Sequence, residues 1–86
     1  MGLVSVMDDN GISVYPNPVN KSFTIDLNGK VKKSDVIITD ITGNIILKTT
    51  IIQSAEVNTN DFATGIYLIH IQSANSLVVK KLIVVR

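Results

Sequence analysis

The chain of 86 residues contains no cysteine, no tryptophan, one histidine and only four aromatic side chains of the Phe and Tyr types. Without cysteine, neither a disulfide nor a thiolate metal site can stabilise the fold. The single histidine, His70, lacks the cysteine or carboxylate partners at suitable spacing that a zinc site requires. Four aromatics are too few for a stacking platform on nucleic acid or polysaccharide. We therefore expect no metal, no cofactor, no nucleic acid and no small-molecule substrate.

Catalytic motifs and strong charge are also missing. The formal net charge is only +1, which is too small to indicate nucleic acid or an anionic membrane surface as a partner. No apolar run approaches the ~18–20 residues that a membrane span needs. The sequence has no Gly-x-Ser-x-Gly elbow, no paired-carboxylate motif and no glycine-rich phosphate loop. We predict that these residues do not form an enzyme.

The chain is rich in β-branched residues, with 13 Ile and 11 Val against three Ala and a single Glu. Such side chains suit a pleated, half-buried surface better than a helix. A chain of this length folds as one domain that buries roughly 60–65% of the surface its unfolded form exposes. Short apolar runs separated by turn signals at regular spacing predict an all-β fold, an antiparallel sandwich of six or seven strands.

Two hairpins are predicted. In the segment 22–27, Phe23, Ile25 and Leu27 alternate with polar residues, which indicates a half-buried strand. The dipeptide Asn28-Gly29 after it is a strong hairpin signal, because type I′ turns require positive φ at both central residues. A second hairpin is expected to join 36–41 to 44–52.

The turn of this second hairpin contains Asp40 and Gly43. Asp40 could be proposed as a catalytic acid. We favour a structural role, because Asp before a tight turn commonly accepts hydrogen bonds from backbone N–H groups.

The run 65–71 is the most apolar strand of the chain. Gly65 allows a sharp turn into it, and Tyr67, Ile69 and Ile71 fall on one face. The other face carries Ile66, Leu68 and His70, so it is also largely apolar. This pattern predicts a central strand that is covered on both sides.

Two further segments carry positional information. Pro16-Asn17-Pro18 cannot lie inside a sheet ladder, since proline lacks the N–H donor, and it should cross from one sheet edge to the next element. In the expected last strand, 77–85, the adjacent Lys80 and Lys81 must point to opposite faces. An inward lysine can protect a sheet edge from uncontrolled pairing, and edge lysines can equally contact a partner.

Taken in order, these segments resemble one family. They are Val14-Tyr-Pro-Asn-Pro-Val19, the strand Phe23–Leu27, the stretch Val36–Ile46, Gly65-Ile-Tyr-Leu-Ile-His-Ile71, and Val78-Val-Lys-Lys-Leu-Ile-Val84. The ordered set is similar to the C-terminal sorting domain, type A, of proteins exported by the type IX secretion system of Bacteroidetes. The resemblance covers residues 12–86, which we expect to be the sorting domain. Residues 1–11 are expected to be a linker, or residues added for expression, and to include the cleavage region.

The resemblance implies an immunoglobulin-like sandwich of about seven strands that directs a larger, covalently linked N-terminal cargo across the outer membrane. It implies transit through the periplasm, recognition by the outer-membrane translocon, removal by a sortase, and a final location that is secreted or on the cell surface. The structural motif residues that it implies are Pro16, Asn17, Pro18, Asp40, Gly43, Gly65 and Tyr67. The residues that it implies for recognition by the translocon are Lys80, Lys81, Leu82 and Ile83. Any catalytic activity would belong to the parent, a secreted hydrolase or protease.

An alternative hypothesis is an accessory fibronectin-like or carbohydrate-binding module of a secreted glycoside hydrolase. The two hypotheses differ in what the surface must offer. A carbohydrate module needs exposed aromatic side chains, whereas a sorting domain needs a folded surface that protein machinery can recognise.

Overall fold

The computed structural model describes residues 11–29, 32–73 and 76–85. These residues form seven strands: β1 (Ser13–Tyr15), β2 (Ser22–Asp26), β3 (Lys33–Asp40), β4 (Ile45–Ile52), β5 (Ser54–Asn58), β6 (Gly65–Gln72) and β7 (Leu77–Val84). In those ranges there is no helix that is long and apolar enough to cross a membrane. Of the expected linker and cleavage region at residues 1–11, all but Gly11 lies outside the described residues.

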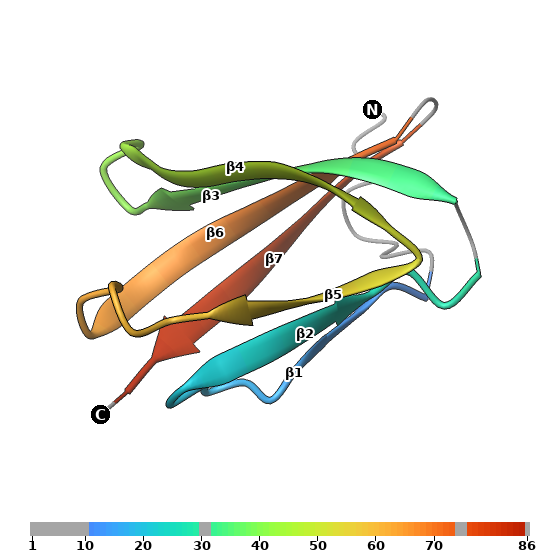
Figure 1. Cartoon of the computed structure of the whole chain (residues 1–86). Helices are drawn as coiled ribbons and strands as arrows, with labels where there is room; N and C mark the ends of the chain where they lie inside the picture. Colours follow the sequence, from blue (N-terminus) through green and yellow to red (C-terminus); the bar gives the residue numbers. More distant parts are fainter. Residues whose placement is uncertain (1–10, 30–31, 74–75, 86) are drawn as a thin grey trace.

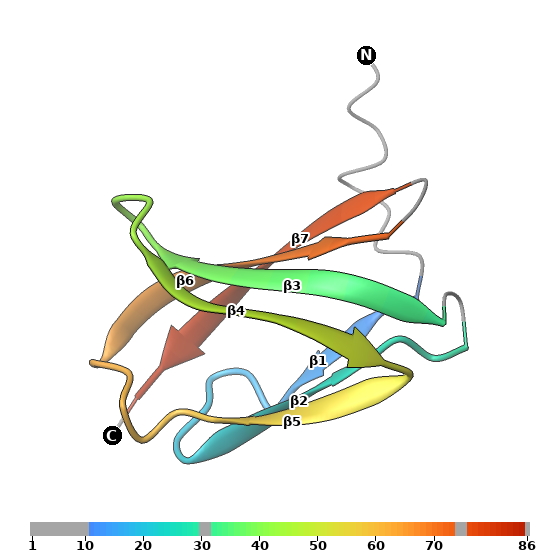
Figure 2. The same ribbon diagram turned by 45° about the horizontal axis from the view of Figure 1, so that its top comes forward.

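The strands form two antiparallel sheets, with the orders β1-β2-β5 and β4-β3-β6-β7 (Figure 1). Figure 2 shows the three-stranded sheet packed against one face of the four-stranded sheet. The pairing of the first, second and fifth strands, and of the third, sixth and seventh, is the arrangement of immunoglobulin-like domains. The fourth strand lies beside the third. The predicted all-β sandwich of about seven strands is confirmed.

The core lies between the two sheets and is built by alternation along each strand. The three inward residues predicted near β2 are buried: Phe23 is 1% exposed, and Ile25 and Leu27 are 0% exposed. Strand β5, the inner face of the other sheet and the connecting segments supply the remaining buried apolar residues, which are Ile12, Val19, Val36, Ile38, Ile51, Val57, Phe62, Tyr67, Ile69, Ile71, Val78, Leu82 and Val84. One side chain of about this size contributes roughly 1.5–3 kcal/mol when it is fully buried.

The strand β6 is central in its sheet but is covered on only one face. Tyr67, Ile69 and Ile71 are buried in the core, whereas Ile66 on the opposite face is 45% exposed. The expectation that both faces are covered is therefore wrong for the described part of the chain. β6 has a neighbouring strand on each edge, β3 and β7, yet the second sheet packs on only one face of the sheet. An apolar outer face remains.

The predicted hairpin at Asn28-Gly29 is also wrong, although the turn conformation is correct. Both residues have positive φ, 54° and 74°, as a type I′ turn requires. The strands on either side, β2 and β3, belong to different sheets. The Asn28 side chain instead bonds to the segment that begins β1. Its amide donates hydrogen bonds to the Gly11 carbonyl and to Ser13 Oγ. Turn residues set local backbone geometry, and they do not decide which strands pair.

Tyr67 connects β6 to the loop that precedes it. Its hydroxyl donates a hydrogen bond of 2.5 Å to the carbonyl oxygen of Ala63, four residues earlier. Its ring packs against Phe62 at a centroid distance of 5.2 Å, which is within the range of favourable aromatic pairs. A tyrosine that bonds back to the backbone at this corner is a recurring feature of immunoglobulin-like sandwiches.

We therefore predict that Tyr67→Phe lowers the free energy of unfolding by about 1 kcal/mol, the net contribution of one hydrogen bond. Tyr67→Ala removes the ring as well and should cost about 3–5 kcal/mol, as other aromatic truncations in cores do. Urea denaturation of both variants measures the difference. Equal losses for the two variants would show that the hydroxyl, not the ring, carries the stabilisation.

Candidate functional site

The residues singled out from the sequence fall into separate regions of the sandwich. Asp40 and Gly43 lie at the turn between β3 and β4, and Gly65 and Tyr67 begin β6. The remaining candidates, Pro16–Pro18 and Lys80–Ile83, lie far apart in the sequence. The structure brings these two segments together along the outer edge of β7.

At the β3–β4 turn, the carboxylate of Asp40 accepts hydrogen bonds from residues of the turn. One of its carboxylate oxygens, Oδ1, accepts hydrogen bonds from the N–H groups of Thr42 (2.9 Å) and Asn44 (3.0 Å) and from the Thr42 hydroxyl (2.7 Å). Gly43 adopts a φ of 97°, a conformation that glycine takes without steric cost. These bonds, the Thr42 hydroxyl foremost, lower the pKa of Asp40. The arrangement caps a turn.

The direction of this shift gives a pH prediction. A carboxyl group whose pKa is lower in the folded state stabilises the fold above its unfolded pKa, and the stabilisation disappears as pH falls through the folded value. Asp40→Asn should therefore unfold at lower urea concentration than the wild type at pH 7. The difference should shrink below about pH 4, where aspartate becomes protonated.

Asp61→Asn serves as the control, since Asp61 is an exposed carboxylate outside this turn. It should leave the urea midpoint close to that of the wild type at pH 7. A constant difference between Asp40→Asn and the wild type from pH 7 to pH 3 would contradict the capping role of the charge.

The side chain of Asn17 acts as a partner for the edge of β7. Its Nδ2 donates a hydrogen bond of 2.7 Å to the carbonyl oxygen of Lys81, and its Oδ1 accepts one of 3.0 Å from the N–H of Ile83. The planar amide thus takes the place that the backbone of a neighbouring strand would occupy. Figure 2 shows the loop between β1 and β2 close to the end of β7.

Val19 continues the same contact with its backbone. Its N–H donates to the carbonyl of Ile83, and its carbonyl accepts from the N–H of Val85, both at 2.8 Å. Val19 and Val84 form a parallel bridge, and the Val19 side chain is fully buried. The backbone N–H and carbonyl of Val19 point toward β7, so the backbone of the preceding Pro18 points away from β7. The N–H that Pro18 lacks therefore removes no bond from this contact. We call Asn17–Val19 the edge clamp.

The edge clamp refines the expectation for Pro16-Asn17-Pro18. The segment does leave the edge of β1, as predicted. It then bonds to β7 of the other sheet before the chain returns to β2. The bonding partner of Asn17 was not predictable from the sequence, because an asparagine between two prolines is equally consistent with an exposed loop.

The four predicted recognition residues do not share one face. Leu82 is fully buried, and Lys80 lies in the same inward row, opposite Ile69, where it is half-buried. Lys81 is exposed and Ile83 is half-buried, and both lie on the outer face of the sheet. Adjacent lysines do point to opposite faces, as strand alternation predicts.

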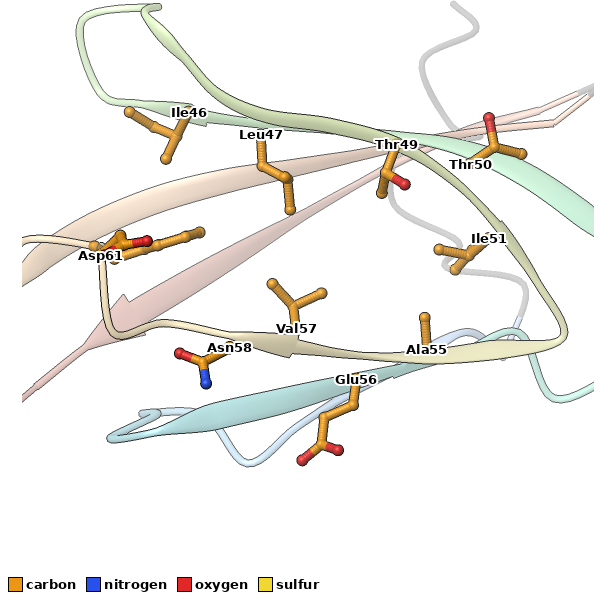
Figure 3. Close-up of a pocket in the computed structure, with 11 residues that line it drawn as sticks. Ile46, Leu47, Thr49, Thr50, Ile51, Ala55, Glu56, Val57, Asn58 and Asp61 are labelled. Atoms are coloured by element: carbon orange, nitrogen blue, oxygen red, sulfur yellow. The ribbon is translucent and has the colours of Figure 1, made fainter.

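A groove of about 490 Å³ lies on the other side of the sandwich, between β4 and β5. Figure 3 shows Leu47, Ile51, Ala55 and Val57 directed into it, and Glu56 directed away. Its walls are mainly apolar, and in the described ranges no group of three or more His, Asp or Glu side chains could hold a metal ion. His70 is elsewhere, half-buried on the outer face and 3.2 Å from the Thr39 hydroxyl.

The edge clamp leads to a stability prediction. Asn17→Ala removes two hydrogen bonds and leaves the carbonyl of Lys81 and the N–H of Ile83 without this partner, so it should cost about 1–3 kcal/mol. Asn17→Asp keeps an acceptor for the N–H of Ile83 but cannot donate to the carbonyl of Lys81. Its unfolding free energy, measured by urea denaturation at pH 7, should be lowered as well.

Gln72→Ala, which also removes an exposed side-chain amide, is the control. A loss for Asn17→Ala no larger than that for Gln72→Ala would mean that the clamp contributes nothing. Amide hydrogen exchange at Ile83 provides a local readout and should accelerate in Asn17→Ala.

The two antiparallel sheets and the bonded part of the β7 edge define a small all-β sandwich module. Comparison with known families agrees. The model of the secretion system C-terminal sorting domain matches residues 13–85, so the chain belongs to this family. It carries a C-terminal sorting signal for type IX secretion, which is not itself catalytic. No curated protein matches the chain.

Proposed function

We propose that residues 12–86 act as the sorting domain of a larger secreted protein and are recognised by the outer-membrane translocon of the type IX system. The cargo precedes the domain in the chain, passes through the periplasm, and is delivered to the cell surface or the medium. A sortase then removes the domain within residues 5–11. The family match carries this proposal, and the folded sandwich with its sealed β7 edge supports it.

Within this proposal the named residues have two kinds of role. Pro16, Asn17, Pro18, Asp40 and Gly43 maintain turns and the edge clamp. Gly65 and Tyr67 do the same for the start of β6. Their replacement impairs export indirectly, by destabilising the domain. Direct contact with the translocon falls to the outward residues of the Lys80–Ile83 segment, which are Lys81 and Ile83.

The alternative, a carbohydrate-binding module, has less support. Three of the four aromatic side chains are buried, and Tyr15 at 49% exposure is the exception. Sugar rings are commonly bound by stacking on exposed aromatic faces, as bases are on single-strand binding platforms. One exposed tyrosine does not make such a platform.

The test is a fusion of this chain to the C-terminus of a folded reporter with its own export signal, expressed in a type IX host. We expect the reporter at the cell surface or in the medium, and in the periplasm when the domain is deleted. The Lys80→Ala/Lys81→Ala double variant should remain folded, as urea denaturation measures, and should lose most export.

Two results would contradict the proposal. One is full periplasmic retention of a fusion whose sorting domain is folded. The other, which concerns the lysines alone, is a double variant that unfolds, because its export defect would then follow from instability. Titration of the purified chain with polysaccharides tests the alternative and should give no binding.

A further inference from the structure

The outer face of β6 and β7 is an apolar surface that the second sheet leaves uncovered. Cross-strand pairing places Ile66 beside Ile83, Leu68 beside Lys81, and His70 beside Val79 on this face. Ile66 is 45% exposed, and Leu68, Val79 and Ile83 are half-buried. Figure 2 shows the three-stranded sheet on the opposite side of these strands. Contiguous apolar surface of this kind commonly marks an interaction site.

The edge of β7, in contrast, is already occupied where the candidate recognition segment lies. The outward carbonyl of Lys81, both outward groups of Ile83 and the N–H of Val85 are bonded to the edge clamp. A peptide that adds as a new strand needs these same groups. It could pair along Lys81–Val85 only by displacing Asn17 and Val19, and with them a fully buried side chain.

We propose that the export machinery contacts the outer face of β6 and β7, centred on Ile66, Ile83 and Lys81, and does not add a strand to the edge of β7. This inference rests on the proposed function and specifies which surface of the domain the export machinery contacts. Leu82, which is buried, then contributes through the fold, and Lys80, which lies in the inward row, is outside the contacted surface.

The charges on this sheet face indicate the chemistry of the partner. Lys33, Lys48 and Lys81 lie on it with one carboxylate, Asp35, and that carboxylate accepts a hydrogen bond of 2.9 Å from the Thr50 hydroxyl. His70 faces the same side and bonds to Thr39. A complementary partner is a protein surface with an apolar centre and carboxylates positioned opposite the lysines.

The two neighbouring lysines provide a matched pair for the test, since they share chemistry and strand and differ in face. In the reporter fusion, Lys81→Ala and the double variant Ile66→Thr/Ile83→Thr should each reduce export about tenfold, as truncation of central interface residues often does. Threonine keeps the β-branched shape that suits a strand. Lys80→Ala and Ile52→Thr, the latter at the far corner of the same sheet, should export like the wild type.

Urea denaturation of each purified variant ensures that only folded domains are compared. Normal export of folded Ile66→Thr/Ile83→Thr, or a defect in Lys80→Ala without one in Lys81→Ala, would overturn the proposal while leaving the sorting function intact. Failure of the wild-type fusion to leave the periplasm would instead contradict the sorting function itself.

A lipid surface is tested separately with vesicles of phosphatidylglycerol and phosphatidylcholine. We expect no co-sedimentation of the purified chain with them. Binding that is lost in Lys81→Ala would assign this face to a membrane and overturn the protein-partner proposal. Faster export of folded Asn17→Ala, in which the edge of β7 is less occupied, would indicate strand addition and would overturn it as well.

Discussion

The bonds between the edge clamp and β7 determine how this sandwich is closed. The end strand of a sheet presents unpaired backbone groups that favour uncontrolled association, and β7 is such a strand in the four-stranded sheet. The clamp bonds the carbonyl of Lys81, both outward groups of Ile83 and the N–H of Val85 with one side-chain amide and one valine backbone. The same contact buries Val19 between the sheets. The same contact therefore both closes this edge of the sheet and completes the core.

Within the Lys80–Ile83 motif, residues that are adjacent in the sequence differ in whether they are buried or exposed. Lys80–Ile83 reads as one continuous signal, yet alternation sends Leu82 into the core and leaves Lys81 on the surface. Half of such a motif faces the core, and the other half faces outward. Loss of export on replacing a residue here has two possible physical origins, and stability measurements distinguish them.

Much of the fold is predictable from the sequence because periodicity is local information. The alternation of Phe23, Ile25 and Leu27, and the burial of Tyr67, follow directly from a period of two. Strand partnership is not local: Asn28-Gly29 has the backbone of a hairpin turn but connects two sheets. The role of Asn17 was hidden for the same reason, because its partners are 64 and 66 residues away. The apolar outer face of β6 resembled a second core face, since composition does not reveal whether a layer covers it.

The distance along the chain between Val19 and Val84 has a consequence for biosynthesis. A contact between segments so far apart must close a long loop, which costs entropy that only the completed contact offsets. In a chain that stops before Ile83, the edge clamp lacks the backbone of Ile83 and the N–H of Val85. The side of the sandwich near β1 then stays open. Only a chain that extends through this segment can present a sealed domain. The parallel bridge thus makes closure of this edge depend on a chain that extends through Val85.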